Sequence, residues 1–232
     1  MARYHNPNLP TSDLAIYIDV NNPRSYNFAE DNPSPKDIKK GVESTVTMYN
    51  GPITSDSYIE FDGTNDFKRV TKDGWKGGTF APDYVTASMW IYPKSNASTG
   101  YNSIIAVESS FLVSFRRVST SGISLWYASN PWQYRGSSAV VAPLEKWSLI
   151  TFVHGATQQK MYVNDQLVRT QNHSGPLAGG NATYPYMTLM ARTNGGSSRA
   201  RARFGALYLY ERELSADEIA KIFYARRGKY NV

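Results

Sequence analysis

The chain contains no cysteine, and its 232 residues include only three histidines. The absence of cysteine excludes disulfides, thiolate metal sites and cysteine nucleophiles. The histidines, His5, His154 and His173, are far apart and show no His-x-x-x-His spacing, and neither Gly-x-Ser-x-Gly nor Gly-x-x-x-x-Gly-Lys occurs. No apolar run approaches the roughly 18 residues of a membrane-spanning helix, and the N-terminus has no apolar signal-peptide core. We therefore expect a soluble protein without a signal peptide.

Aromatic residues and turn formers are plentiful instead. Phe, Trp and Tyr make up 13% of the chain, with 17 tyrosines, and 17 glycines and 12 prolines punctuate it. This composition favours strands joined by turns, and the length suits one large all-β domain.

The positive charge is concentrated near the C-terminus. From Arg192 onward the chain has nine Lys and Arg against four Asp and Glu, which accounts for most of the net charge of +6. Nucleic acid, an acidic glycan or an acidic protein surface could each match such a surplus. Nucleic acid fits least well, because the basic segment lacks interleaved aromatic residues.

The stretch 58–67, Tyr-Ile-Glu-Phe-Asp-Gly-Thr-Asn-Asp-Phe, combines a strand, a turn and the start of another strand. Alternation places Ile59 and Phe61 on one face. Asp62-Gly63 indicates a tight turn, because glycine accepts a positive φ and the carboxylate can accept hydrogen bonds from the next backbone N–H groups. We predict a hairpin or a strand corner here.

Similar patterns predict the remaining elements. Ser215 as N-cap, with Glu218 three residues later, predicts a helix over 215–226 whose apolar stripe contains Ile219, Ile222 and Phe223. Strands are expected over residues 14–20, 44–50, 85–93, 103–108, 111–118, 123–127, 147–155, 160–168, 186–191 and 201–210.

Three motifs resemble a known family. The segment 58–67 is similar to the apolar-x-Phe-Asp-Gly-x-x-Asp-aromatic signature of the laminin-G-like branch of the concanavalin A-like lectin/glucanase superfamily. Residues 15–26, with Tyr-x-Asp followed by Asn-Pro-x-Ser-Tyr, resemble the opening of such domains in tailed-bacteriophage virion proteins, and residues 205–219 resemble the family's C-terminal strand and helix. Residues 27–41 depart from the family pattern.

The resemblance implies an all-β jelly roll of two packed antiparallel sheets with one short C-terminal helix. Residues 1–13 would form an N-terminal arm and residues 14–232 the domain. It also implies a virion structural protein without enzymatic activity, a decoration of the capsid or a component of the neck or tail, with further copies of itself as possible neighbours. The alternatives are a carbohydrate-binding host-attachment module and a polysaccharide-degrading hydrolase. Expected partners are thus other virion proteins and host or environmental polysaccharide, with neither nucleic acid nor a membrane.

Arg199, Arg201 and Arg203 alternate with two alanines. On a strand the three guanidinium groups would project from one side at intervals of ~7 Å, a spacing suited to carboxylates or sulfates. The competing interpretation is an edge strand protected by charge against aggregation. Among the aromatic residues, Trp132 and Tyr134 lie in a polar loop and are candidates to contact sugars or a partner protein, whereas Trp126 is expected in the core.

Carboxylates suggest two further sites. Glu60 and Asp62 match the first two members of a Glu-x-Asp-x-Glu glucanase strand, but the third is missing, so we predict no catalysis. Asp62, Asn65 and Asp66 offer oxygens within five residues, which suits Ca²⁺. The alternative is a hydrogen-bonded turn that closes the corner without an ion.

Overall fold

The computed structural model describes residues 9–26, 44–55, 57–72, 82–120, 122–129, 135–136, 139, 141–173, 175–177, 183, 186–192 and 197–232. Trp132, Tyr134 and residues 1–8 of the expected N-terminal arm lie outside these ranges. Within them no helix is long and apolar enough to cross a membrane.

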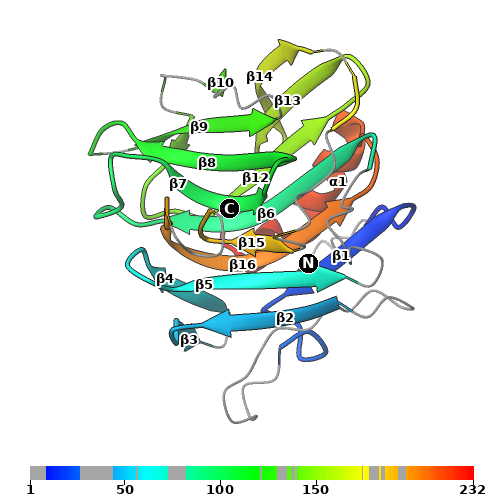
Figure 1. Ribbon diagram of the computed structural model, residues 1–232. Helices are drawn as coiled ribbons and strands as arrows, with labels where there is room; N and C mark the ends of the chain where they lie inside the picture. The colour runs from blue at the N-terminus through cyan, green and yellow to red at the C-terminus, as the bar shows by residue number, and fades with distance from the viewer. Residues whose placement is uncertain are drawn as a thin grey trace, which may run out of the picture.

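The described residues form two antiparallel sheets of eight strands each (Figure 1). Sheet A has the order β14 (Gln166–Asn172), β13 (Gln158–Val163), β12 (Ser148–His154), β6 (Val85–Pro93), β16 (Arg201–Tyr210), β4 (Tyr58–Asp62) and β3 (Ile53–Ser55), and β1 (Leu14–Asp19) also pairs with β16. Sheet B has the order β10 (Arg135–Gly136), β9 (Gly122–Ser129), β8 (Phe111–Arg117), β7 (Asn102–Val107), β15 (Met187–Leu189), β5 (Phe67–Lys72) and β2 (Ser44–Tyr49), and β11 (Ala142–Pro143) pairs with β9.

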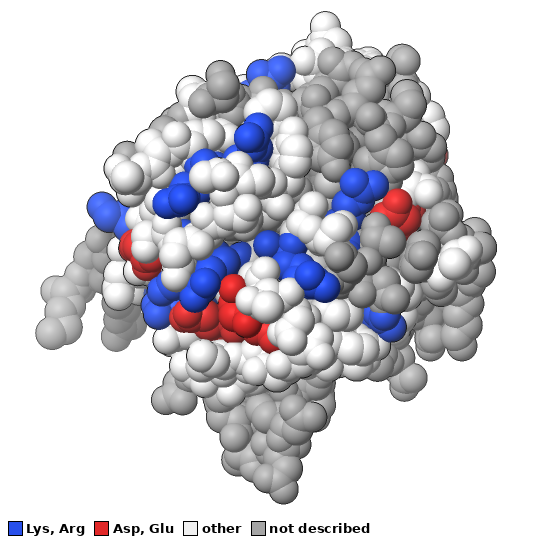
Figure 2. Space-filling model, turned by 60° about the vertical axis from the view of Figure 1, so that its left-hand side comes forward, with Lys and Arg blue, Asp and Glu red and all other residues white. Residues whose placement is uncertain are grey.

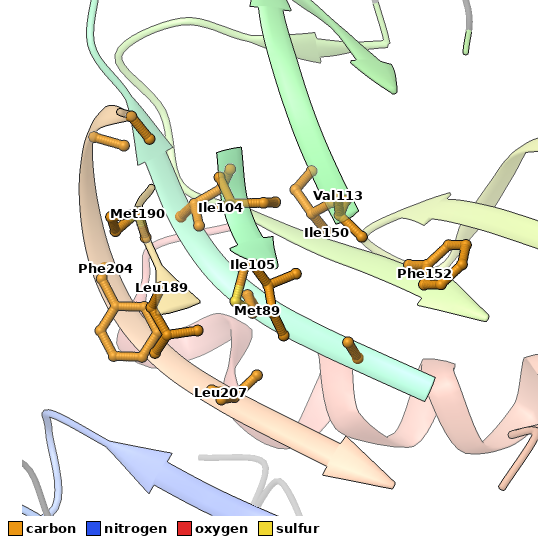
Figure 3. Close-up of a cluster of buried hydrophobic side chains, with 14 of the residues drawn as sticks. Met89, Ile104, Ile105, Val113, Ile150, Phe152, Leu189, Met190, Phe204 and Leu207 are labelled. Carbon is orange, nitrogen blue, oxygen red and sulfur yellow. The ribbon is translucent and has the colours of Figure 1, made fainter. Parts of the chain in front are cut away.

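The main core lies between the two sheets. Figure 3 shows part of it, with Met89 and Ile150 of sheet A facing Ile105 and Val113 of sheet B. Alternation explains how sheet A covers two cores at once. In β6, Met89 faces sheet B, whereas Trp90 on the opposite face packs in a second cluster with the C-terminal helix. Both faces of this part of sheet A are therefore apolar.

The C-terminal helix α1 (Ala216–Arg226) covers the outer face of sheet A. The Ser215 side chain accepts a hydrogen bond from the Glu218 N–H, and the Glu218 carboxylate accepts one from the Ser215 N–H. Ile219, Ile222 and Phe223 are buried. The helix and its apolar stripe are confirmed as predicted. The turn η1 (Arg227–Lys229) follows it.

A buried carboxylate ties the end of the chain to β1. Asp19 is 1% exposed, accepts a hydrogen bond from the Tyr17 hydroxyl, and lies 3.5 Å from Nη2 of Arg226 and 3.9 Å from Nζ of Lys229. Burial is the main reason that the pKa of Tyr17 rises to about 12, and Asp19 adds to it. Because an unpaired buried charge is costly, this network fixes the position of the C-terminal segment on sheet A.

The stretch 58–67 is a corner and not a hairpin, because β4 belongs to sheet A and β5 to sheet B. Ile59 and Phe61 are fully buried, and Gly63 has φ +75°. A Cβ at Gly63 would lie 2.9 Å from Cβ of Arg201, so the turn needs glycine both for its conformation and for this close approach.

Two expectations are wrong, one about the arginines of β16 and one about Trp126. The strand β16 lies between β6 and β4 and is therefore not an edge strand, so the edge-protection interpretation of its arginines fails. Trp126 is half-buried on the outer face of sheet B, and its neighbour Tyr127 occupies the core. In a strand, a shift of one residue exchanges the two faces, and both aromatic residues fit a strand equally well.

Candidate functional site

The outer face of sheet A is only partly covered by the helix. A register shift between Phe204 and Ala206 changes the alternation along β16, so that Arg203 shares the outer face with Tyr208. Tyr208 lies under the C-terminal helix, whereas Arg203 lies beyond it and is half-buried. Tyr58 and Glu60 of β4 and Tyr92 of β6 are also half-buried there. This uncovered part of sheet A is the outer-face site.

Aromatic rings dominate one side of the outer-face site. Trp147 lies just before β12. The centroid of its ring system is 5.6 Å from the ring centroid of Tyr92, 6.4 Å from that of Tyr58 and 4.8 Å from that of Tyr230. Tyr230 in turn stacks on Trp90 at 4.3 Å, which anchors the cluster in the core beneath the helix. A groove of about 530 Å³ opens beside these rings, lined by Tyr92, Pro143, Glu145, Lys146, Trp147, Ser148, Asn164, Tyr230, Asn231 and Val232.

Charged groups next to the rings are mutually neutralised. Arg203 lies 2.7 Å from the Glu60 carboxylate, with its guanidinium 4.3 Å from the ring centre of Tyr58 and 4.9 Å from that of Tyr92. Lys94 is 3.9 Å from Glu60 and 3.5 Å from Glu145. These groups offer several donors and acceptors for hydroxyl groups beside apolar ring faces.

Glu145 is held in a restricted conformation at the groove. Its φ is +53°, its N–H donates to the Pro93 carbonyl, and Oε1 accepts the N–H of Ser95 at 2.6 Å. Burial acts to raise the pKa of Glu145, but the bonds from Ser95 and Tyr92 and the charge of Lys94 hold it below its ordinary value. A positive φ at a non-glycine residue is uncommon and is found preferentially at functional sites.

The two carboxylates of the predicted glucanase strand are both engaged by neighbouring groups. A glycosidase needs one carboxyl group that keeps its proton and a second one placed to act on the sugar. Glu60 is paired with two cations, and Oδ1 of Asp62 accepts the N–H groups of Thr64 and Asn65. These backbone bonds lower the pKa of Asp62 against the raising effect of burial.

The three predicted arginines have different neighbours in the structure. Arg203 pairs with Glu60 in the outer-face site, Arg201 lies opposite Asp62 at the start of β16, and Arg199, just before β16, bridges Ser103. Their alternating partners Ala200 and Ala202 are fully buried, as predicted. The other sugar-contact candidates, Trp132 and Tyr134, lie outside the described residues.

The predicted calcium ligands form a hydrogen-bonded turn. Besides the two bonds to Asp62, Oδ2 of the buried Asp66 accepts the N–H of Asp62 at 3.2 Å. Burial raises the pKa of Asp66. In the described part of the chain no group of three or more His, Asp or Glu is placed to hold a metal. A Ca²⁺ at Asp62, Asn65 and Asp66 stays a prediction.

Sequence reasoning missed most of the groove. Alternation in β6 places Tyr92 on the outer face, but nothing local indicates that Trp147 and Tyr230 meet it, since they come from segments more than 50 residues apart.

Sequence reasoning also missed that His154 and His173 come together, with ring centroids 4.1 Å apart. His154 accepts from the Gln159 amide through Nδ1 if Nε2 donates to the Gly175 carbonyl.

Comparison with known proteins is consistent with this fold. Solved structures with similar folds include the receptor binding domain of botulinum neurotoxin C/D mosaic serotype (TM-score 0.65, 12% identity) and the Botulinum Neurotoxin Type G Receptor Binding Domain (0.64, 13%). A third is the serotype D ligand binding domain in complex with N-acetylneuraminic acid (0.64, 12%). The match covers 91% of this chain in all three, and 51%, 51% and 50% of the neighbours, so the chain spans about half the length of these domains. At this identity the likeness shows the fold alone.

The family assignment comes from sequence. No curated protein sequence matches the chain. A family model described as the concanavalin A-like lectin/glucanases superfamily, in its laminin-G-like form, matches residues 54–220, which is well over half of the chain. The matched range runs from β3 to helix α1 and includes the strands that carry the outer-face site. The chain belongs to the concanavalin A-like lectin/glucanases superfamily.

Proposed function

We propose that this protein is a non-enzymatic, carbohydrate-binding structural protein of a phage virion, most simply a capsid decoration or accessory protein. The observation that carries the binding function is the groove at the outer-face site. There, the faces of Trp147 and Tyr92 lie beside the polar groups of Glu145 and Asn164. Ligand sites in proteins combine apolar walls with a few fixed polar groups, and sugars present both kinds of surface.

Similar folds support a binding function. One neighbour, the serotype D ligand binding domain, was solved with N-acetylneuraminic acid bound. Fold alone does not determine function, so the argument rests on the groove in this chain. The pairing of Glu60 with Arg203 and Lys94 supports a role without catalysis.

The virion assignment rests on the sequence resemblance in residues 15–26 to virion domains of tailed phages. A decoration needs a surface for its neighbours and can present a second surface outward. The basic surplus near the C-terminus suits an acidic partner surface. We expect mass spectrometry of purified particles of the encoding phage to detect the chain; its absence from intact particles would refute the virion role.

The groove is tested by measuring glycan binding of wild type and Trp147→Ala by calorimetry against a polysaccharide panel. Removal of an aromatic anchor from a binding site typically costs more than about 1.4 kcal/mol, so we expect at least a tenfold loss of affinity. Tyr224→Ala is the matched control, because Tyr224 is exposed on α1 outside the groove. Tyr92→Phe, which removes only the hydroxyl, serves if Trp147→Ala unfolds.

Two results would contradict the proposal. A folded Trp147→Ala variant and a Tyr92→Phe variant that both bind every glycan as wild type does would place the site elsewhere. Release of reducing ends from a bound polysaccharide, abolished by Glu60→Gln, would establish an enzyme instead.

A further inference from the structure

Four arginines that form no ion pair with any described residue surround one loop at the end of the sandwich. Arg116 and Arg117 end β8, whereas Arg201 begins β16 and Arg199 lies just before it. We call these four residues the basic rim. This end of the molecule lies on the left in Figure 1 and faces the viewer in Figure 2, which shows a band of Lys and Arg side chains with a group of Asp and Glu at its lower edge.

Hydrogen bonds to the loop 94–101 bring the two pairs together. Nη1 of Arg117 donates to the Ser95 carbonyl at 3.0 Å, and Nε of Arg116 donates to the Thr99 carbonyl at 3.1 Å. At the other side of the loop, the Lys94 N–H donates to the Arg201 carbonyl at 3.2 Å. The rim therefore joins sheet B to sheet A across the loop.

Arg199 completes this arrangement. It forms a β-bridge with Ser103 at the start of β7, close to the end of the same loop. Its Nε is buried and has no hydrogen-bond partner among the described residues. A buried donor without a partner is unfavourable and would be satisfied by an incoming acceptor.

The rim differs electrostatically from the outer-face site. Arg203 and Lys94 are neutralised by Glu60 and Glu145, but none of the four rim arginines makes an ion pair within the described part of the chain. Asp62 of β4 lies opposite Arg201 without forming a salt bridge, and its Oδ1 accepts the N–H of Thr64 within the turn. Among the described residues the rim thus carries positive charge that is not neutralised by ion pairs, in a geometry set by backbone contacts.

The rim and the groove are continuous. The Ser95 carbonyl accepts from Arg117, and the Ser95 N–H donates to Glu145, which lines the groove. Two aromatic rings also lie at the rim, since the Arg116 guanidinium is 5.2 Å from the ring centre of Tyr101 and 5.8 Å from that of Trp126.

We propose that the basic rim makes this protein selective for acidic polysaccharides, whose carboxylate or sulfate groups pair with the rim arginines while neighbouring sugar rings occupy the groove. This inference rests on the proposed glycan binding and adds the charge of the ligand. Guanidinium groups form bidentate hydrogen bonds with carboxylates, which favours arginine over lysine at such a site. An acidic protein would match the charge as well, but it would make no use of the adjoining groove.

The test compares polygalacturonate, its fully methyl-esterified neutral form and poly-glutamate as probes for the full chain. Arg199→Gln/Arg201→Gln removes two rim charges and keeps the side-chain stems. Arg169→Gln/Lys221→Gln removes two charges from β14 and α1, away from the rim, as the matched control. We expect the rim variant to lose about 3- to 30-fold in affinity for polygalacturonate, from two partly exposed ion pairs, and the control to change little.

Salt should reduce polygalacturonate binding, since the Debye length falls from about 10 Å at 0.1 M to about 3 Å at 1 M. Binding of the neutral ester should persist and depend on Trp147 but not on the rim. If ester and acid bind alike in wild type, or the rim and control variants lose equally, the inference fails while the groove remains. If poly-glutamate binds as tightly as polygalacturonate, the rim is an acidic-protein surface and the inference also fails. If the wild-type protein binds neither the acid nor the ester, nor any other glycan, the proposed function itself is refuted.

Discussion

Lys68 places an amine in the core between the sheets, and its replacement by Met should stabilise the protein. The side chain has no exposed surface, and Nζ lies 5.7 Å from the ring centre of Phe61 and 5.4 Å from that of Phe204. No hydrogen-bond partner for Nζ exists among the described residues. Contacts with the faces of these two rings are therefore the main interactions that offset the loss of hydration of the amine.

Comparing the energy of the cation–π contacts with the cost of desolvation shows whether Lys68 is charged or neutral in the core. A desolvated cation–π contact contributes about 2 kcal/mol, whereas removing an ammonium group from water costs several kcal/mol even after relaxation. Burial therefore lowers the pKa of Lys68 well below its usual 10.5. Met fills a similar volume without an amine, so Lys68→Met should gain at least about 1–3 kcal/mol at pH 7.5, the cost of leaving a buried polar group unpaired.

The gain should depend on pH with a defined sign. A lysine whose pKa is lowered in the folded state contributes its full stability only above pH 10.5 and loses it as the pH falls toward the folded pKa, because the unfolded chain binds the extra proton. The advantage of Lys68→Met over wild type should therefore shrink by up to about 1.4 kcal/mol for each pH unit raised toward 10.5.

Urea unfolding at pH 7.5, 8.5 and 9.5 measures this difference, with the exposed Lys146→Met as the matched control. A destabilised Lys68→Met variant whose difference from wild type is independent of pH would refute the reasoning. It would mean that the rings hold Lys68 as a cation.

Two further predictions concern the corner and the histidine pair. Gly63→Ala should cost about 1–3 kcal/mol in urea unfolding, and more than Gly51→Ala, because both positions have positive φ but only a Cβ at 63 meets Arg201; equal losses would exclude the contact. Burial, assisted by His173, lowers the pKa of His154 to about 4, so its contribution to stability is complete above pH 6.5 and is lost as the pH falls toward 4. Wild type should lose about 2 kcal/mol more than His154→Gln between pH 7 and pH 5, and parallel losses would contradict the assignment.

Much of the fold could be predicted from local pattern. The capping box predicted the helix start at Ser215, and the strand expected over 85–93 is β6, in which alternation puts Met89 on one face of the sheet and Trp90 on the other. Strand order could not be predicted, because periodicity does not record which strands are neighbours. That is why β16 was open to interpretation as an edge strand and why the pairing of Glu60 with Arg203 was missed.

The site was less predictable because it depends on irregular backbone. The register shift after Phe204 lets one strand carry Arg203 on an open surface and Tyr208 under a helix, although a regular strand would place them on opposite faces. Positive φ at Glu145 and Asn164 shapes the groove, and neither residue type demands it.

The corner and the basic rim depend on the same contact. Because Gly63 has no side chain, Arg201 can approach the turn closely enough to start β16 beside β4, and the Arg201 carbonyl then accepts the Lys94 N–H that holds the loop 94–101. That loop positions Arg117 through Ser95. The turn that carries the chain from one sheet to the other thus also sets where the rim arginines lie, so fold and charge placement have a common origin in the stretch 58–67.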